Sequence, residues 1–122
     1  RNVSSVIGSA QKDSGATEDL QFVDAIKNIV RGKRSWEIAL SRELVSRSLK
    51  PGHVEEILIG TLDDPKLGLR FFNFLGLHRG FDHSTASFCI LIHALVKANL
   101  FWPASSLLQT LLLRALKPSE VF

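Results

Sequence analysis

The fold is decided by RSLKPGHV at residues 47–54 and by its near copy RALKPSEV at residues 114–121. Arg, Leu-Lys-Pro and Val recur in register between the two stretches, at an offset of 114 − 47 = 67. The apolar residues before them follow the same offset, because Leu40 and Leu44 align with Leu107 and Leu111. Helix-pair repeats have periods of about 34 residues, so this offset predicts two periods of such a repeat.

The unit between the two copies becomes visible at half that offset. Shifting the sequence by 34 residues aligns Val54, Ile57, Leu58 and Gly60 with Phe88, Leu91, Ile92 and Ala94. Shifting it by 36 residues aligns Gly68, Phe71, Phe72 and Leu75 with Ala104, Leu107, Leu108 and Leu111. The difference between the two shifts falls in a connecting turn, where an insertion costs little free energy. Gly68 and Ala104 are small, and we expect them where two helices approach closely.

Apolar periodicity and capping residues predict the helices. Apolar residues at i, i+3, i+4 and i+7 indicate a helix face that packs on a core. Ser, Thr or Asp before such a pattern, or Pro at its first position, marks a helix start. The first predicted helix is capped by Thr17 and carries Phe22, Val23, Ile26, Ile29 and Val30, and the second is opened by Ser35 and carries Leu40, Leu44 and Val45. A third covers His53–Leu62, and a fourth has Asp64 as its N-cap and Pro65 at its first position. The last two cover Ser84–Lys97 and Trp102–Arg114.

These patterns predict an all-α fold, an α-solenoid of antiparallel helix pairs in repeats of roughly 35 residues. No segment alternates apolar and polar residues as a strand does. Residues 1–16 are rich in Ser, Gly and Ala without an apolar period, which is typical of a disordered tail. The remaining predicted segments are N-terminal helices with a degenerate half repeat at 17–50, a degenerate repeat at 51–84, a well-formed repeat at 85–119, and the start of a further repeat at 120–122.

Composition narrows the possible partners and compartments. The net charge of +3 fits an anionic partner without requiring one, and no acidic residue occurs between Asp82 and Glu120. A single cysteine, Cys89, excludes an intrachain disulfide and favours a reducing compartment. The most apolar stretch, Ala98–Leu113, is too short and too polar to span a membrane. The chain begins at Arg1 and contains no Met, which predicts a processed or trimmed product.

The segment Thr85–Ser119 resembles a pentatricopeptide repeat. It is 35 residues long (119 − 85 + 1), and its matching residues are an aromatic at Phe88, then Leu91-Ile92, Leu95, Lys97-Ala98, Ala104, Leu107-Leu108, Leu111 and Leu116-Lys117-Pro118. The stretch PKLGLRFF at 65–72, followed by GFDH at 80–83, resembles the degenerate first repeats of plant organellar members of the P class. The chain is thus similar to the N-terminal region of such a protein. The tetratricopeptide repeat has a similar period, but its Trp, Gly-Tyr and Pro pattern is absent.

The resemblance implies single-stranded RNA binding, with about one nucleotide per repeat read by side chains on one face. It places the base-reading pair at Cys89 and Ser119, the residue that sandwiches the base at Ala86, and a phosphate-contacting lysine at Lys97. The sequence departs from the family at two of these positions. A thiol is a weak hydrogen-bond donor, and alanine offers little stacking surface. Only Lys97 keeps both the residue type and the role.

Each of these residues also has a simpler interpretation. A lysine at a helix C-terminus complements the helix dipole without any ligand, and Cys89 could be a small packed side chain. Cys89 and His93 stand at i and i+4, so a zinc site with His78 and His83 is an alternative. Asp63 and Asp64 indicate a helix start rather than paired acid and base. We therefore predict no enzymatic activity and no cofactor.

Two functions of different classes remain open. The first is an RNA-binding, non-catalytic segment of an organellar RNA-processing or expression factor. The second is a structural or protein-interaction subunit of an organellar ribonucleoprotein such as the mitochondrial ribosome. The last helix favours a covering partner or further repeats, because it is rich in leucine without a polar outer face. The resemblance favours the mitochondrion over the plastid.

Overall fold

The computed structural model describes residues 14–32, 34–45 and 47–116, and within these ranges the regular structure is entirely helical. In chain order the helices are α2 (Ser14–Gly32), α3 (Trp36–Glu43), α4 (Pro51–Ile59), α5 (Pro65–Arg79), α6 (Thr85–Lys97) and α7 (Phe101–Ala115). The prediction of an all-α fold is confirmed.

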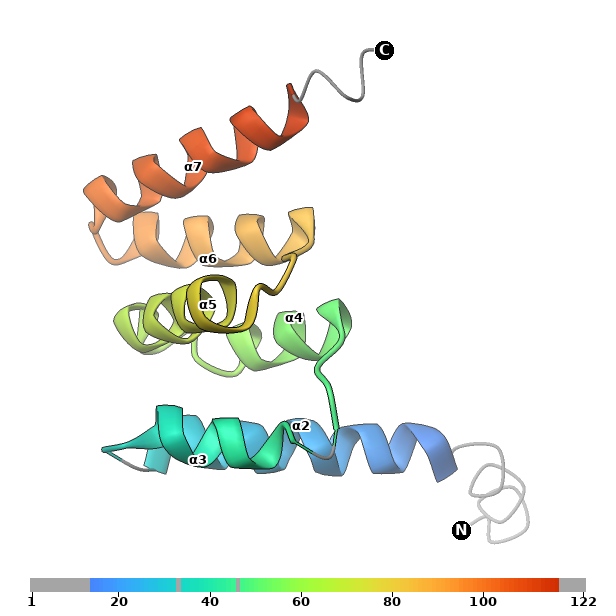
Figure 1. The fold of residues 1–122 in the computed structure, drawn as a ribbon. Coiled ribbons are helices and arrows are strands. Elements are labelled where there is room, and N and C mark those ends of the chain that lie inside the picture. The colour runs from blue at the N-terminus through green and yellow to red at the C-terminus, as the bar shows by residue number, and fades with distance from the viewer. Residues whose placement is uncertain (1–13, 33, 46, 117–122) are drawn as a thin grey trace, which may run out of the picture.

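The helices form three layers stacked one on another, α2 with α3, α4 with α5, and α6 with α7 (Figure 1). The first helices of the three layers, α2, α4 and α6, run in the same direction, and α3 and α7 return in the opposite direction (Figure 1). Helix α4 lies between α2 and α6 and contacts both. This arrangement is an α-solenoid of helix pairs, in which each layer packs mainly against its neighbours.

A continuous apolar core runs through the stack. Its largest fully buried side chains include Ile26 from α2, Trp36 from α3, Ile57 from α4, Phe71 from α5 and Leu91 from α6. Every layer thus contributes to one core, which no layer could form alone.

Two predicted helix starts are confirmed by their capping hydrogen bonds. The carboxylate of Asp64 accepts from the Leu67 amide at 3.3 Å, and Pro65 occupies the first position of α5. The hydroxyl of Ser84 accepts from the Ser87 amide at 3.1 Å at the start of α6. Each bond satisfies one of the backbone N–H groups that a helix leaves without a partner at its first turn.

Other predicted boundaries were wrong. Helix α2 begins at Ser14, so Thr17 lies inside the helix and does not cap it, and residues 14–16 belong to α2 rather than to a tail. Residues 1–13 of that predicted tail lie outside the described ranges. Helix α3 ends at Glu43, so Leu44 is its C-cap and Val45, which follows it, is 85% exposed.

The helix predicted at His53–Leu62 is shifted toward its N-terminus, to Pro51–Ile59. Its start is stabilised by the imidazole of His53, whose Nδ1 accepts from the Lys50 amide at 3.0 Å. At the other end the chain enters a turn, in which the Thr61 hydroxyl donates to the Leu58 carbonyl at 3.1 Å. Proline at the first position accounts for the earlier start, because its fixed φ suits a helix and its missing N–H needs no partner there.

The predicted close approach at Gly68 is confirmed. A Cβ atom at this position would lie 3.0 Å from the Thr61 hydroxyl and 3.5 Å from a methyl group of Leu91. Ala104, which aligns with Gly68 in the next layer, is 3% exposed. Within residues 14–32, 34–45 and 47–116, none of the helices combines the length and the apolar character of a membrane span.

Candidate nucleic-acid interface

Three of the four predicted RNA-contacting residues lie on one exposed face of α6. Ala86, Cys89 and Lys97 are all exposed, and His93 lies between them on the same face. Spacings of three and four residues place side chains above one another along a helix. The opposite face of α6, with Phe88 among its residues, is buried in the core. The fourth predicted residue, Ser119, lies outside the described ranges.

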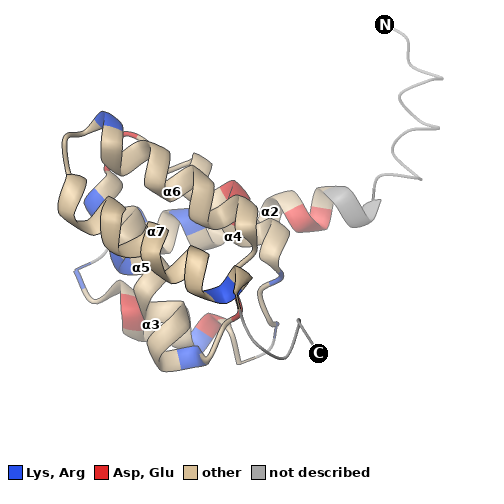
Figure 2. Ribbon diagram, turned by 90° about the horizontal axis from the view of Figure 1, so that it is seen from above, with Lys and Arg blue, Asp and Glu red and all other residues tan. Residues whose placement is uncertain are grey.

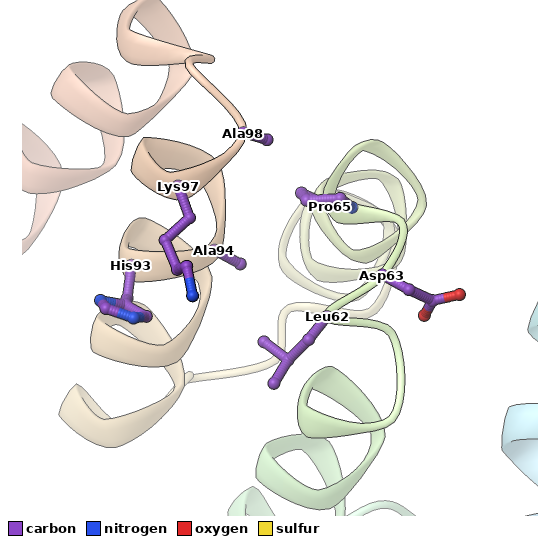
Figure 3. Close-up of a pocket in the computed structure, with 7 residues that line it drawn as sticks. All are labelled: Leu62, Asp63, Pro65, His93, Ala94, Lys97 and Ala98. Carbon is purple, nitrogen blue, oxygen red and sulfur yellow. The ribbon is translucent and has the colours of Figure 1, made fainter.

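The C-terminal half of this face borders a groove of about 300 Å³ between α6 and the turn that joins α4 to α5. It is lined by Leu62, Asp63, Pro65, His93, Ala94, Lys97 and Ala98. The side chain of Lys97 extends into the space beside Leu62, whereas the carboxylate of Asp63 points away from the groove (Figure 3). The groove therefore combines an apolar wall with one ammonium group.

Asp63 does not neutralise Lys97, because it pairs with Arg31 on α2. The Arg31 guanidinium donates two hydrogen bonds to the Asp63 carboxylate, at 3.0 and 2.7 Å. The hydrogen bonds from Arg31 hold the pKa of Asp63 below its usual value, and the same contact raises the pKa of Arg31. Both groups stay charged at neutral pH and their charges largely cancel.

Lys97 has no ion pair in the ranges 14–32, 34–45 and 47–116. It is also the one charged residue of α6, which is otherwise apolar or neutral and tan over most of its length in Figure 2. Arg70 on α5, by contrast, engages the Glu37 carboxylate at 2.8 Å. A single available positive charge at the end of an uncharged face can attract one phosphate group.

The thiol of Cys89 is exposed and is not the packed side chain that the simpler interpretation predicted. The alternative of a zinc site is not supported by the positions of its ligands. His83 is 5% exposed and stacks on the Phe72 ring with 3.6 Å between ring centres, and its Nε2 donates to the Phe72 carbonyl at 2.9 Å. Across the described part of the chain, no group of three or more His, Cys, Asp or Glu side chains is arranged to hold a metal ion.

Two further residues occupy the corresponding positions one layer earlier, and the sequence interpretation missed them. The shift that aligns Val54 with Phe88 also aligns Glu55 with Cys89 and Asp63 with Lys97. The positions that resemble base-reading and phosphate-contacting positions on α6 are thus occupied by carboxylates on and just after α4. The signal was present in the alignment of the two units, but it could be found only by comparing their exposed positions as well as their buried ones.

The leucines of α7 divide between the core and the surface. Leu107 is 8% exposed, whereas Leu108, Leu112, Leu113 and the C-cap residue Leu116 are 46 to 72% exposed. Leu108 aligns with Phe72 of α5, which is buried against the Phe88 ring of the next layer. The predicted apolar patch on α7 is therefore present in the described part of the chain.

Curated proteins of Arabidopsis thaliana match this chain along most or all of its length. One pentatricopeptide repeat-containing protein is 87% identical over all 122 residues, which make up 14% of that relative. A second is 32% identical over 90 residues, 74% of this chain and 12% of the relative. A third, named as mitochondrial, is 30% identical over 102 residues, 82% of this chain and 19% of the relative.

The chain thus spans less than one fifth of the length of each of these relatives. No family model matches the sequence, and no solved structure matches it. The identity of 87% over every residue, together with stacked helix pairs of the expected period, decides the family. The chain belongs to the pentatricopeptide repeat family of plant proteins.

Proposed function

We propose that this chain is a single-stranded RNA-binding segment of an organellar RNA-processing or expression factor, and that it acts without catalysis. The observation that carries the proposal is the state of Lys97. It is exposed, it lacks an ion pair within the described ranges, and it stands at the end of the uncharged face that carries Ala86 and Cys89. A strand of RNA laid along this face would place a phosphate at Lys97 and a base beside Cys89.

The chemistry of this face favours binding over base selection. Base edges are distinguished by directional hydrogen bonds from amide, hydroxyl or carboxylate groups, and the thiol of Cys89 makes weak ones. Alanine at position 86 contributes little of the stacking energy that an aromatic or large aliphatic side chain supplies. We therefore expect this repeat to bind RNA with little preference among the four bases.

Titration of the chain with a labelled single-stranded RNA at about 50 and 200 mM salt tests the proposal. Affinity should fall as salt rises, because counterions are released from the RNA when phosphates are contacted. Replacing Lys97 by alanine should weaken binding and reduce the salt slope by about 0.7 per lost phosphate contact. Arg79→Ala, which removes an equal charge from the exposed end of α5, is the matched control. No binding at the lower salt concentration would refute the proposal.

The apolar patch on α7 favours a second function, a structural or protein-interaction role in an organellar ribonucleoprotein. Leu108 and Leu112 lie exposed, and Leu108 aligns with Phe72 of the preceding layer, which packs against Phe88 of α6. A chain that uses this patch for a partner should bind a hydrophobic dye and self-associate when isolated. A monomeric chain that binds no dye would remove the support for this role.

The mitochondrion is the proposed compartment, because one relative carries that word in its name. Import of the full-length protein into isolated mitochondria and chloroplasts, followed by protease treatment, distinguishes this proposal from the plastid alternative.

A further inference from the structure

Helix α4 presents to the surface the same positions as α6, one layer earlier. The two helices run in parallel and contact each other. Their buried residues correspond in the alignment of the two units, since Val54 and Ile57 are as fully buried as Phe88 and Leu91. Residues that correspond in this way share a face, so the outward groups of α4 would meet the same RNA strand that α6 meets.

Glu55 takes the place of the base-reading Cys89. Its carboxylate accepts a hydrogen bond from the Ser84 hydroxyl at 2.7 Å, and Ser84 is the N-cap of α6. The negative charge is therefore held at the N-terminus of α6, where the helix dipole stabilises it. One oxygen of this carboxylate is thus engaged by Ser84 rather than open to a base edge, and its charge repels a nearby phosphate.

Asp63 takes the place of the phosphate-contacting Lys97. It is held by the two hydrogen bonds from Arg31, and Arg31 also donates to the Gly60 carbonyl at 3.2 Å. The cation nearest to this position is therefore already engaged by groups of the protein. At the position of Lys97, a phosphate approaching α4 would find the Asp63 carboxylate. The guanidinium of Arg31 is turned toward that carboxylate and is not available to the phosphate.

From these contacts, and on the basis of the proposed RNA-binding function, we propose that the α4–α5 layer is closed to RNA and that the nucleotide-binding track begins at α6. The carboxylates of Glu55 and Asp63 are held by hydrogen bonds to the layers on either side, from Ser84 and from Arg31. The exclusion of RNA from this layer thus follows from the packing of the layers. The structure thus assigns Glu55 and Asp63 as the residues that set one boundary of the RNA footprint.

Removing the two charges without changing side-chain size tests this boundary. Glu55→Gln and Asp63→Asn, singly and together, are titrated with single-stranded RNA beside the unaltered chain. We expect the double variant to bind about five- to tenfold more tightly at low salt, because Glu55→Gln removes a like charge near a phosphate and Asp63→Asn releases the positive charge of Arg31. Asp63→Asn should also steepen the salt slope by about 0.7, because Arg31 becomes free to contact one more phosphate.

Glu18→Gln is the matched control, because it removes the same charge from an exposed position on α2. Thermal melting checks that each variant is folded, and the single variants keep the test valid if the double variant is unstable. The proposed boundary would be overturned if both single variants kept the RNA affinity and the salt slope of the unaltered chain while Lys97→Ala still weakened binding. That result would leave the proposed function intact. An unaltered chain that binds no RNA would overturn both.

Discussion

The guanidinium of Arg114 lies 5.0 Å from the centre of the Phe88 ring and 3.0 Å from the carboxylate of Asp82. Arg47, its counterpart in the first copy of the repeated sequence, makes the same two kinds of contact. It lies 4.3 Å from the centre of the Phe22 ring and pairs with Asp19. The arginine that begins RSLKPGHV and RALKPSEV therefore ties the second half of a helix pair to the first helix of that pair.

This arginine should contribute measurably to stability. Arg114→Ala removes the cation over Phe88, the ion pair with Asp82 and the hydrogen bond to the His83 carbonyl. We expect a loss of about 1–2 kcal/mol in the free energy of unfolding, measured by chemical denaturation. Arg114→Lys should recover only part of it, because lysine lacks the planar fork of donors.

Arg79→Ala is the control for that series, and it should change stability by less than about 0.5 kcal/mol, as exposed substitutions usually do. Equal effects of the substitutions at Arg114 and Arg79 would show that the repeated arginine is not a structural contact.

The two glycines of α5 at positions 68 and 76 should respond oppositely to alanine. A Cβ at Gly76 would meet its nearest neighbour at 4.0 Å, so Gly76→Ala should stabilise the helix by roughly 0.5–1 kcal/mol. A Cβ at Gly68 would meet the Thr61 hydroxyl at 3.0 Å, and that hydroxyl is buried and bonded to Leu58. Gly68→Ala should therefore lower the melting temperature despite its better helix propensity. A rise in melting temperature for both variants would contradict the close approach.

Stability should depend on pH through His83. Burial holds the pKa of His83 below its usual 6.5, and the nearby Arg114 acts in the same direction, whereas hydrogen bonding to Phe72 and the charge of Asp82 oppose the shift. The unfolded chain binds a proton more readily than the folded one, so stability rises with pH in this region. The neutral ring makes its full contribution to the free energy of unfolding above pH 6.5. This contribution is lost as the pH falls from there through the lowered pKa of His83.

Denaturation of the chain at several pH values between about 5 and 8 measures this dependence. His83→Phe keeps an aromatic ring against Phe72 but cannot be protonated, so its stability should vary less with pH over that range. The same pH dependence in the variant would mean that another group is responsible.

Base preference should be gained by changing Cys89. Asparagine at this position would offer two donors and one acceptor to a base edge, whereas the thiol offers one weak donor. We expect Cys89→Asn to widen the affinity differences among homopolymeric single-stranded RNAs, by several-fold for the preferred base. Cys89→Ala is the control, and it should bind all homopolymers much as the unaltered chain does. A Cys89→Asn variant without preference would show that this position does not face a base.

The sequence predicts those features of the fold that depend on residues close together in the chain or on a repeated stretch. The caps at Asp64 and Ser84 precede apolar periods, and the second copy of the repeated stretch reveals the period of the stack. The start of α2 was missed because Ser14 to Ala16 carry no apolar signal. The ion pairs were missed for a different reason, since their partners lie far apart in the sequence and meet only when layers stack, as Arg31 and Asp63 do.

For the candidate site, the sequence predicts which residues share one face of α6, but not whether the charge on that face is neutralised. The exposed positions of Ala86, Cys89 and Lys97 follow from helical spacing, so the face of α6 could be predicted. The sequence does not predict whether Lys97 is neutralised, because that depends on the direction in which the Asp63 side chain points. This direction is fixed by Arg31, two helices earlier in the chain.

We propose that RNA binds on the exposed face of α6. The most direct test is a titration of isotope-labelled chain with single-stranded RNA, followed by the chemical shifts of its backbone amides. We expect the amide shifts of Ala86, Cys89, His93 and Lys97 to change with saturation, with smaller changes around Glu55 on α4. Changes confined to the exposed leucines of α7, or no changes at low salt, would contradict it.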